Sequence, residues 1–68
     1  MERTIKLCTI ENGRFMNEIY VTYDDGTTEC IGSYYPDELY YAESEFVGLT
    51  KHQAQHLMYQ RDIAYLQS

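Results

Sequence analysis

The sequence lacks tryptophan, has one proline and two cysteines, and contains no long hydrophobic run. Two cysteines, Cys8 and Cys30, are too few for a disulfide-stapled domain and predict free thiols. The longest apolar run is far below the ~18 residues of a membrane span. The first residues do not show the charged-then-apolar pattern of a signal peptide. We therefore expect a cytoplasmic protein.

Basic residues are scarce and absent from the middle of the chain. No lysine or arginine occurs from residue 15 to residue 50, whereas eight of the eleven acidic residues lie there, and the formal net charge is −6. Such a field repels nucleic acid and anionic membranes, so we expect direct binding to neither. It attracts a basic protein surface and accelerates the encounter with it.

The chain contains histidine and cysteine, which can act in catalysis, but they do not occur in the sequence pattern of a known catalytic motif. His52 and His56 are four residues apart, as in the zinc-protease motif His-Glu-x-x-His, but Gln53 stands where the general base would be. The four glycines are dispersed, so no phosphate-binding loop is indicated. We expect no enzyme, no cofactor and no metal. A metal at the histidine pair and a reactive Cys8 are the alternatives.

The first half of the chain predicts three strands, over residues 3–10, 15–23 and 27–34. Asn12-Gly13 and Asp25-Gly26 are typical of tight hairpin turns. A three-residue first loop would pair Leu7 with Ile19 and Ile5 with Val21. A two-residue second loop would pair Tyr23 with Thr28, Val21 with Cys30 and Ile19 with Gly32. The predicted core face of the sheet then carries Ile5, Leu7, Ile19, Val21 and Cys30.

The second half predicts a turn or short helix over 36–42, because Pro36 suits the first turn of a helix. Residues 43–49 are expected to form a loop that places Phe46 or Leu49 in the core. Thr50 and Gln53 form a capping box for a final helix over 51–66. The prediction is one α+β domain over 1–68: a three-stranded antiparallel β-meander with a short helical turn and a C-terminal α-helix packed on one face.

The final helix has two apolar stripes on nearly opposite sides. The first can pack on the core face of the sheet and consists of Ala54, Leu57, Met58, Ala64 and Tyr65. The second consists of Tyr59, Ile63 and Leu66, and predicts a weak homodimer. The competing interpretation is that scattered apolar residues on a surface are normal.

The acidic middle of the chain is also rich in tyrosine, which supplies rigid contact area at interfaces but also favours strands. In size and charge the chain resembles small virus-encoded inhibitors, including many anti-CRISPR and anti-restriction proteins. The resemblance implies a non-enzymatic protein that blocks a basic, nucleic-acid-handling protein partner. The candidate contacts are Glu18, Tyr20, Asp24, Asp25, Glu29, Tyr34, Tyr35, Asp37, Glu38, Tyr40, Tyr41, Glu43 and Glu45. The alternative function is a self-associating accessory domain.

Overall fold

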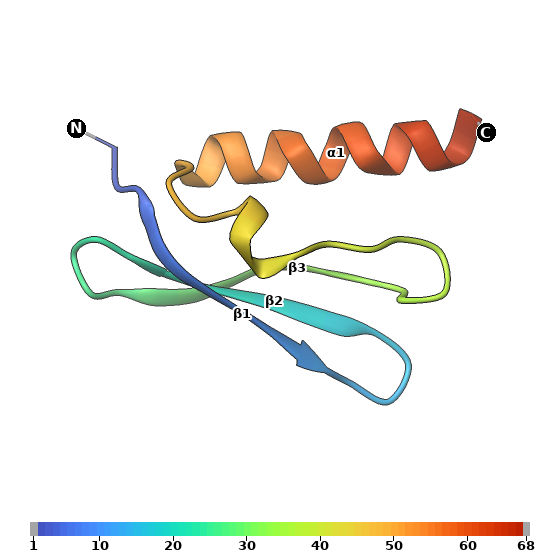
Figure 1. The fold of residues 1–68 in the computed structure, drawn as a ribbon, viewed down its shortest axis with the longest axis horizontal. Helices are drawn as coiled ribbons and strands as arrows, with labels where there is room; N and C mark the ends of the chain where they lie inside the picture. Colours follow the sequence, from blue (N-terminus) through green and yellow to red (C-terminus); the bar gives the residue numbers. More distant parts are fainter. Residues whose placement is uncertain (1, 68) are drawn as a thin grey trace.

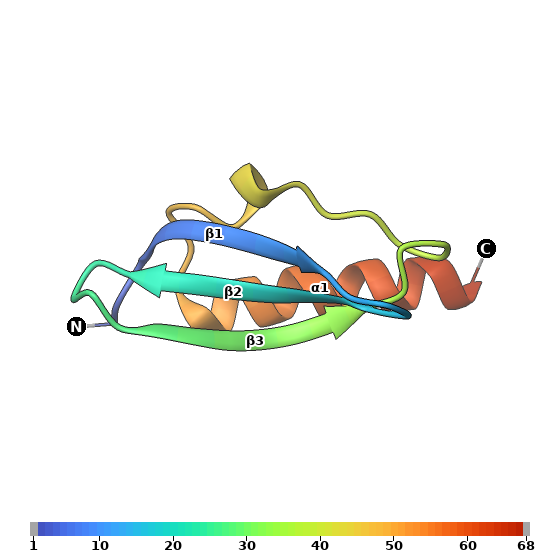
Figure 2. The same ribbon diagram turned by 90° about the horizontal axis from the view of Figure 1, so that it is seen from below.

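The computed structural model describes residues 2–67 and confirms the α+β fold. Strands β1 (Ile5–Asn12), β2 (Asn17–Tyr23) and β3 (Thr28–Tyr34) form an antiparallel sheet in the order β1-β2-β3. A single 3₁₀ turn, η1 (Glu43–Glu45), precedes helix α1 (Lys51–Gln67). The helix lies along one face of the sheet (Figure 1). The other face is open among the described residues, as the turned view shows (Figure 2).

The register of the first hairpin differs from the prediction. Asn12 pairs with Asn17, so the loop covers residues 13–16 and is one residue longer than expected. Ile19 therefore faces Ile10 instead of Leu7, and Ile5 faces Tyr23 instead of Val21. An irregularity between Ile5 and Leu7 changes the alternation of side chains along β1. The register set by the first loop pairs Leu7 with Thr22 and leaves Leu7 59% exposed, while Cys8 and Ile10 pack against the core. The irregularity returns Ile5 to the core face opposite Tyr23.

The second hairpin is partly as predicted. The amide of Tyr23 donates to the carbonyl of Thr27, which closes a three-residue loop with Gly26 at a φ of 89°. Val21 and Tyr20 consequently pair with Glu29 and Cys30, and the predicted Val21–Cys30 and Tyr23–Thr28 pairs are wrong.

A bulge next to Ile19 then adds one residue to β3. It restores the predicted pairing of Ile19 with Gly32. Cys30, predicted on the core face, is exposed on the open face.

The core lies between the sheet and the segments that follow it. The buried apolar residues are Ile5, Ile19, Val21, Tyr23, Tyr34, Tyr41, Phe46 and Ala54. Phe46 is fully buried and Leu49 packs against the cluster, as predicted. Residues 36–38 form a turn, in which the amides of Glu38 and Leu39 donate to the carbonyl of Tyr35. That turn is followed by an extended segment and not by a helix.

Helix α1 begins with the predicted capping box. The amide of Gln53 donates to Thr50 Oγ1 over 3.1 Å, and the amide of Thr50 donates to Gln53 Oε1 over 3.0 Å. Ala54 is buried, and Leu57 and Met58 pack against the core.

The predicted core-facing stripe does not continue to the end of α1, because Ala64 is exposed and Tyr65 is 41% exposed. The last turns of the helix lie beside the segment after β3 and not over the sheet (Figures 1 and 2).

Candidate functional site

Acidic residues lie at both ends of the sheet, and their ion pairing differs between the two ends. At the end that holds the turn between β2 and β3, two carboxylates have basic partners, whereas the exposed Asp24 accepts a hydrogen bond from Thr4 Oγ1 over 3.3 Å and is in no ion pair of the described residues. Lys51 Nζ lies 2.9 Å from Glu29 Oε1, and Arg3 Nη1 lies 3.6 Å from Asp25 Oδ2. Hydrogen bonds from Lys51 and Tyr23 lower the pKa of Glu29, and those from Thr27 lower the pKa of Asp25. These two carboxylates therefore help to hold the fold.

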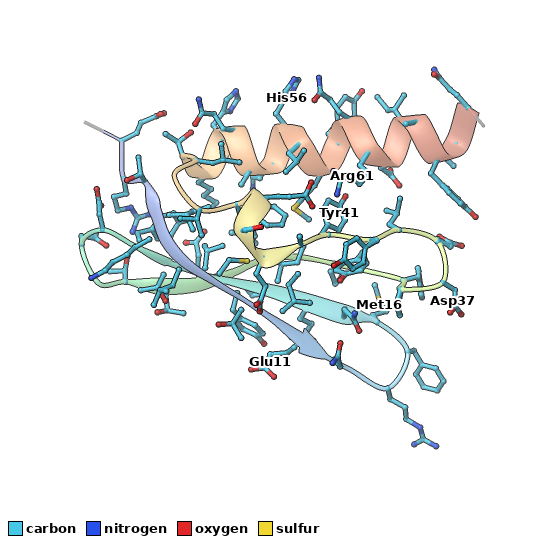
Figure 3. All side chains as sticks on the ribbon, viewed as in Figure 1. Glu11, Met16, Asp37, Tyr41, His56 and Arg61 are labelled. Carbon is cyan, nitrogen blue, oxygen red and sulfur yellow. The ribbon has the colours of Figure 1, made fainter. Side chains whose placement is uncertain are left out.

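At the other end of the sheet the carboxylates are exposed and lack basic partners. We call this group the acidic end, and it consists of Glu11, Glu18, Asp37 and Glu38. Among residues 2–67, none of the four lies within ion-pair distance of a lysine, arginine or histidine. Arg14 lies in the turn at the same end, with its guanidinium 5.6 Å from the ring centroid of Phe15. Figure 3 shows Glu11 pointing away from the helix and Asp37 in the turn after β3.

Two carboxylates of the acidic end face each other across neighbouring strands. Glu11 and Glu18 are direct partners in the pairing of β1 with β2. Like charges at directly opposite positions destabilise a sheet. The hydroxyl of Tyr20 donates to Glu18 Oε2 over 2.5 Å, which raises the pKa of Tyr20 and holds one of the two carboxylates in place. The pair is thus a local cost to stability with no compensating cation in the described chain.

Glu45, also a candidate contact, is instead engaged inside the molecule. Arg61 holds its carboxylate with two hydrogen bonds, of 2.6 and 3.0 Å, and donates a third to the carbonyl of Tyr40 over 2.7 Å. The amide of Ala42 donates to the same carboxylate over 2.7 Å. The guanidinium lies 4.7 Å from the ring centroid of Tyr41 (Figure 3). This network fastens residues 40–45 to α1.

The Glu45–Arg61 pair predicts a stability change in acid. The hydrogen bonds from Arg61 and then Ala42 lower the pKa of Glu45 from 4.5 to about 2. Its stabilisation is therefore complete above pH 4.5 and is lost as the pH falls toward 2. Because the pair is partly exposed, we expect Glu45→Gln to remove only about 1–2 kcal/mol of this pH-dependent stability. Urea unfolding at several pH values measures it.

Glu38→Gln is the matched control for this experiment, because Glu38 is exposed and outside the ion pairs of the described residues. The control is expected to follow the wild-type profile. An unchanged profile for Glu45→Gln would contradict the assigned role of the pair.

The candidate tyrosines differ in their accessibility. Tyr34 and Tyr41 are only 6% and 3% exposed and pack edge to face with ring centroids 4.9 Å apart, so they belong to the core. Tyr35 and Tyr40 are 50% and 76% exposed and can contact a partner. Tyr20 is half-buried on the open face of the sheet. From the sequence alone, the buried and the exposed member of each neighbouring pair, Tyr34–Tyr35 and Tyr40–Tyr41, cannot be told apart.

A cavity lies at the acidic end, between the sheet and the segment after β3. Its volume is about 380 Å³, and its walls include Asn17, Tyr34, Tyr40 and Glu43. Asn17 is the one buried polar residue of the described chain, and its amide nitrogen donates to Tyr34 Oη over 3.3 Å. Glu43 Oε2 accepts the backbone amide of Ile10 over 2.7 Å. Tyr34, Tyr40 and Glu43 are among the contacts predicted from the sequence, whereas Asn17 is not.

No cysteine or histidine of the described residues lines this cavity. Burial, followed by the negative charge of Glu43, raises the pKa of the Cys8 thiol to about 11, which makes it a poor nucleophile at neutral pH. Cys30 is exposed, and its thiol donates to the carbonyl of Gly32. His52 and His56 are exposed on α1, where His56 points away from the sheet (Figure 3). Within residues 2–67, no three His, Cys, Asp or Glu side chains gather as a metal site requires.

The predicted self-association stripe of α1 is partly exposed. Tyr59 and Leu66 are 62% and 72% exposed, whereas Ile63 is half-buried. In the part of the chain that the structure describes, no helix has the length and apolar character to cross a membrane.

Comparison with protein-family models, with curated proteins and with solved structures finds no match to this chain.

Proposed function

We propose that this chain is a small, non-enzymatic, cytoplasmic binding protein that occupies a basic surface of a protein partner. The partner is one that handles nucleic acid, so that the chain acts as an inhibitor in the manner of virus-encoded anti-CRISPR or anti-restriction proteins. The observation that carries the proposal is the separation of charge along the sheet. At one end Lys51 and Arg3 pair with Glu29 and Asp25, whereas at the other end Glu11, Glu18, Asp37 and Glu38 form no ion pair among the described residues.

The arrangement of the acidic end favours binding to a basic surface over a purely solubilising role. Solubility requires only net charge, which can be spread over the surface at no structural cost. Here Glu11 and Glu18 are directly opposed, and this opposition lowers the stability of a small sheet. A basic partner would relieve the repulsion on binding. Tyr35 and Tyr40 would add rigid contact area beside the carboxylates.

A second function has its own support, which is the exposure of Tyr59 and Leu66 on α1. A second copy of the chain could cover this stripe and form a weak homodimer. The acidic end would then keep the dimer soluble and need not contact a partner.

Capture of partners from native lysate at low and high salt, read by mass spectrometry, separates the two functions. The inhibitor proposal predicts that a basic, nucleic-acid-handling protein is retained at low salt and released at high salt. It also predicts that adding the purified chain displaces nucleic acid from that protein. Persistence of the nucleic-acid complex at saturating chain would contradict the proposal. Recovery of the chain alone, with a dimeric mass in sedimentation, would support self-association.

A further inference from the structure

We infer that the cavity at the acidic end binds the guanidinium group of an arginine side chain. The inference rests on the proposed function, because it names the group that a basic partner inserts there. It concerns a different set of atoms from the exposed carboxylates of the acidic end. The cavity, of about 380 Å³, is near the lower limit of the roughly 300–1,000 Å³ typical of ligand sites. That size suits one inserted side chain better than a large cofactor.

Two of the polar side chains that line the cavity, Asn17 and Glu43, each carry an oxygen that accepts no hydrogen bond from the described residues. The side-chain amide nitrogen of Asn17 donates to Tyr34 Oη, and the side-chain oxygen Oδ1 of Asn17 has no donor among the described residues. Glu43 uses Oε2 for the amide of Ile10, which leaves Oε1 without a partner there. Both residues line the cavity, and Asn17 is only 9% exposed. A ligand with several donors matches this pair of acceptors, and a carboxylate or phosphate would be repelled by Glu43.

The aromatic ring of Tyr40 favours an arginine side chain over other hydrogen-bond donors, such as a lysine ammonium group. Tyr40 is 76% exposed as a residue, while its backbone carbonyl accepts a hydrogen bond from Arg61 over 2.7 Å. The ring is therefore accessible on a fixed backbone. A planar guanidinium stacks on such a ring and directs its donors sideways, whereas an ammonium is a strongly hydrated point charge. No lysine or arginine lines the cavity, so the site has no cation of its own among residues 2–67.

A hydrogen bond and an ion pair hold the wall of the cavity in place before any ligand binds. The hydrogen bond from Ile10 orients the carboxylate of Glu43 against β1. The Glu45–Arg61 pair fixes the segment that carries Tyr40 against α1. Binding therefore needs little further ordering of the chain, which favours affinity.

The test is a nuclear magnetic resonance titration of the isotope-labelled chain with Nα-acetyl-arginine N-methylamide. We expect saturable shifts of the side-chain amide of Asn17 and of the backbone amides of residues 40–43. Glu43→Gln keeps an acceptor for Ile10 but removes the charge, and it is expected to weaken binding about tenfold. Tyr40→Ala removes only an exposed ring and is expected to weaken binding as well. Glu2→Gln makes the same charge change far from the cavity and outside the acidic end, and is expected to change affinity less than about twofold.

Two analogues test the identity of the group. The neutral citrulline analogue has nearly the shape of the arginine compound, and the lysine analogue has its charge. Weaker binding of both supports the inference, and equal binding of either one overturns it. Equal losses for Glu43→Gln and Glu2→Gln would also overturn it, because they would show attraction by net charge alone. No protein partner is needed, so a failure here is distinct from a failure of the proposed function, which lysate capture decides.

Discussion

Replacing Phe46 with alanine is expected to leave much of the chain unfolded at room temperature. Phe46 is fully buried, and its ring lies 5.6 Å from that of Tyr41. Removing a buried phenylalanine costs about 3–5 kcal/mol, because apolar burial is lost and a cavity remains. A domain of 68 residues is stable by only about 3–10 kcal/mol in total. One side chain outside the regular elements therefore carries a large share of the stability.

Urea unfolding, followed by circular dichroism, measures this effect. Val47→Ala is the matched control, because Val47 is the next residue and is 48% exposed, and its expected change is below about 0.5 kcal/mol. Phe46→Leu keeps most of the buried volume and gives a folded variant that can be compared quantitatively. Similar stabilities for Phe46→Ala and Val47→Ala would contradict the assigned core.

The fold class and the helix could be predicted from the sequence because their signals are local. The capping box needs only Thr50 and Gln53, and both predicted hydrogen bonds are present. The glycine of the second hairpin turn adopts a positive φ, as Asp25-Gly26 indicates. Burial of Phe46 was also predictable, since a large apolar residue in a short connecting loop needs a place in the core.

The strand register could not be predicted, because it depends on loop length and on bulges. The first loop begins one residue later and is one residue longer than predicted, and the changed register moved Leu7 from the predicted core to the open face. The second hairpin shows the same effect for Cys30. The alternation of apolar and polar residues along a strand does not reveal where a bulge interrupts it.

The candidate site was only partly predictable for a related reason. The sequence shows an acidic stretch without lysine or arginine. In the structure, however, Glu29 and Glu45 pair with Lys51 and Arg61 of α1, which lie far along the chain. Which carboxylates stay unpaired is decided by tertiary contacts. Asn17 shows no signal in the sequence, since a polar residue at a strand start is ordinary. Only the cavity around it indicates a role.

Neutralising three carboxylates of the acidic end is expected to slow association with the basic partner about tenfold or more at low salt. The variant combines Glu18→Gln, Asp37→Asn and Glu38→Gln, all exposed residues of the described chain. The amide oxygen that Glu18→Gln introduces can still accept the hydrogen bond from Tyr20, so the open face of the sheet is preserved. The dependence of the association rate on salt should become flatter, because fewer charges steer the encounter.

The control variant carries the same change in net charge at other exposed positions: Glu2→Gln, Asp24→Asn and Asp62→Asn. Any effect of total charge is equal in the two variants, so a difference between them isolates the location of the charges. Thermal unfolding of both variants shows that each remains folded before binding is compared.

The most direct test of the proposed docking is therefore the association rate of these two variants with the captured basic partner across a range of salt concentrations. We predict that the association rate of the acidic-end variant is about tenfold lower than that of the wild type at low salt, while the rate of the control stays within about threefold of the wild type. Equal losses in both variants, or no loss in either, would contradict the claim that the chain binds its partner through the acidic end.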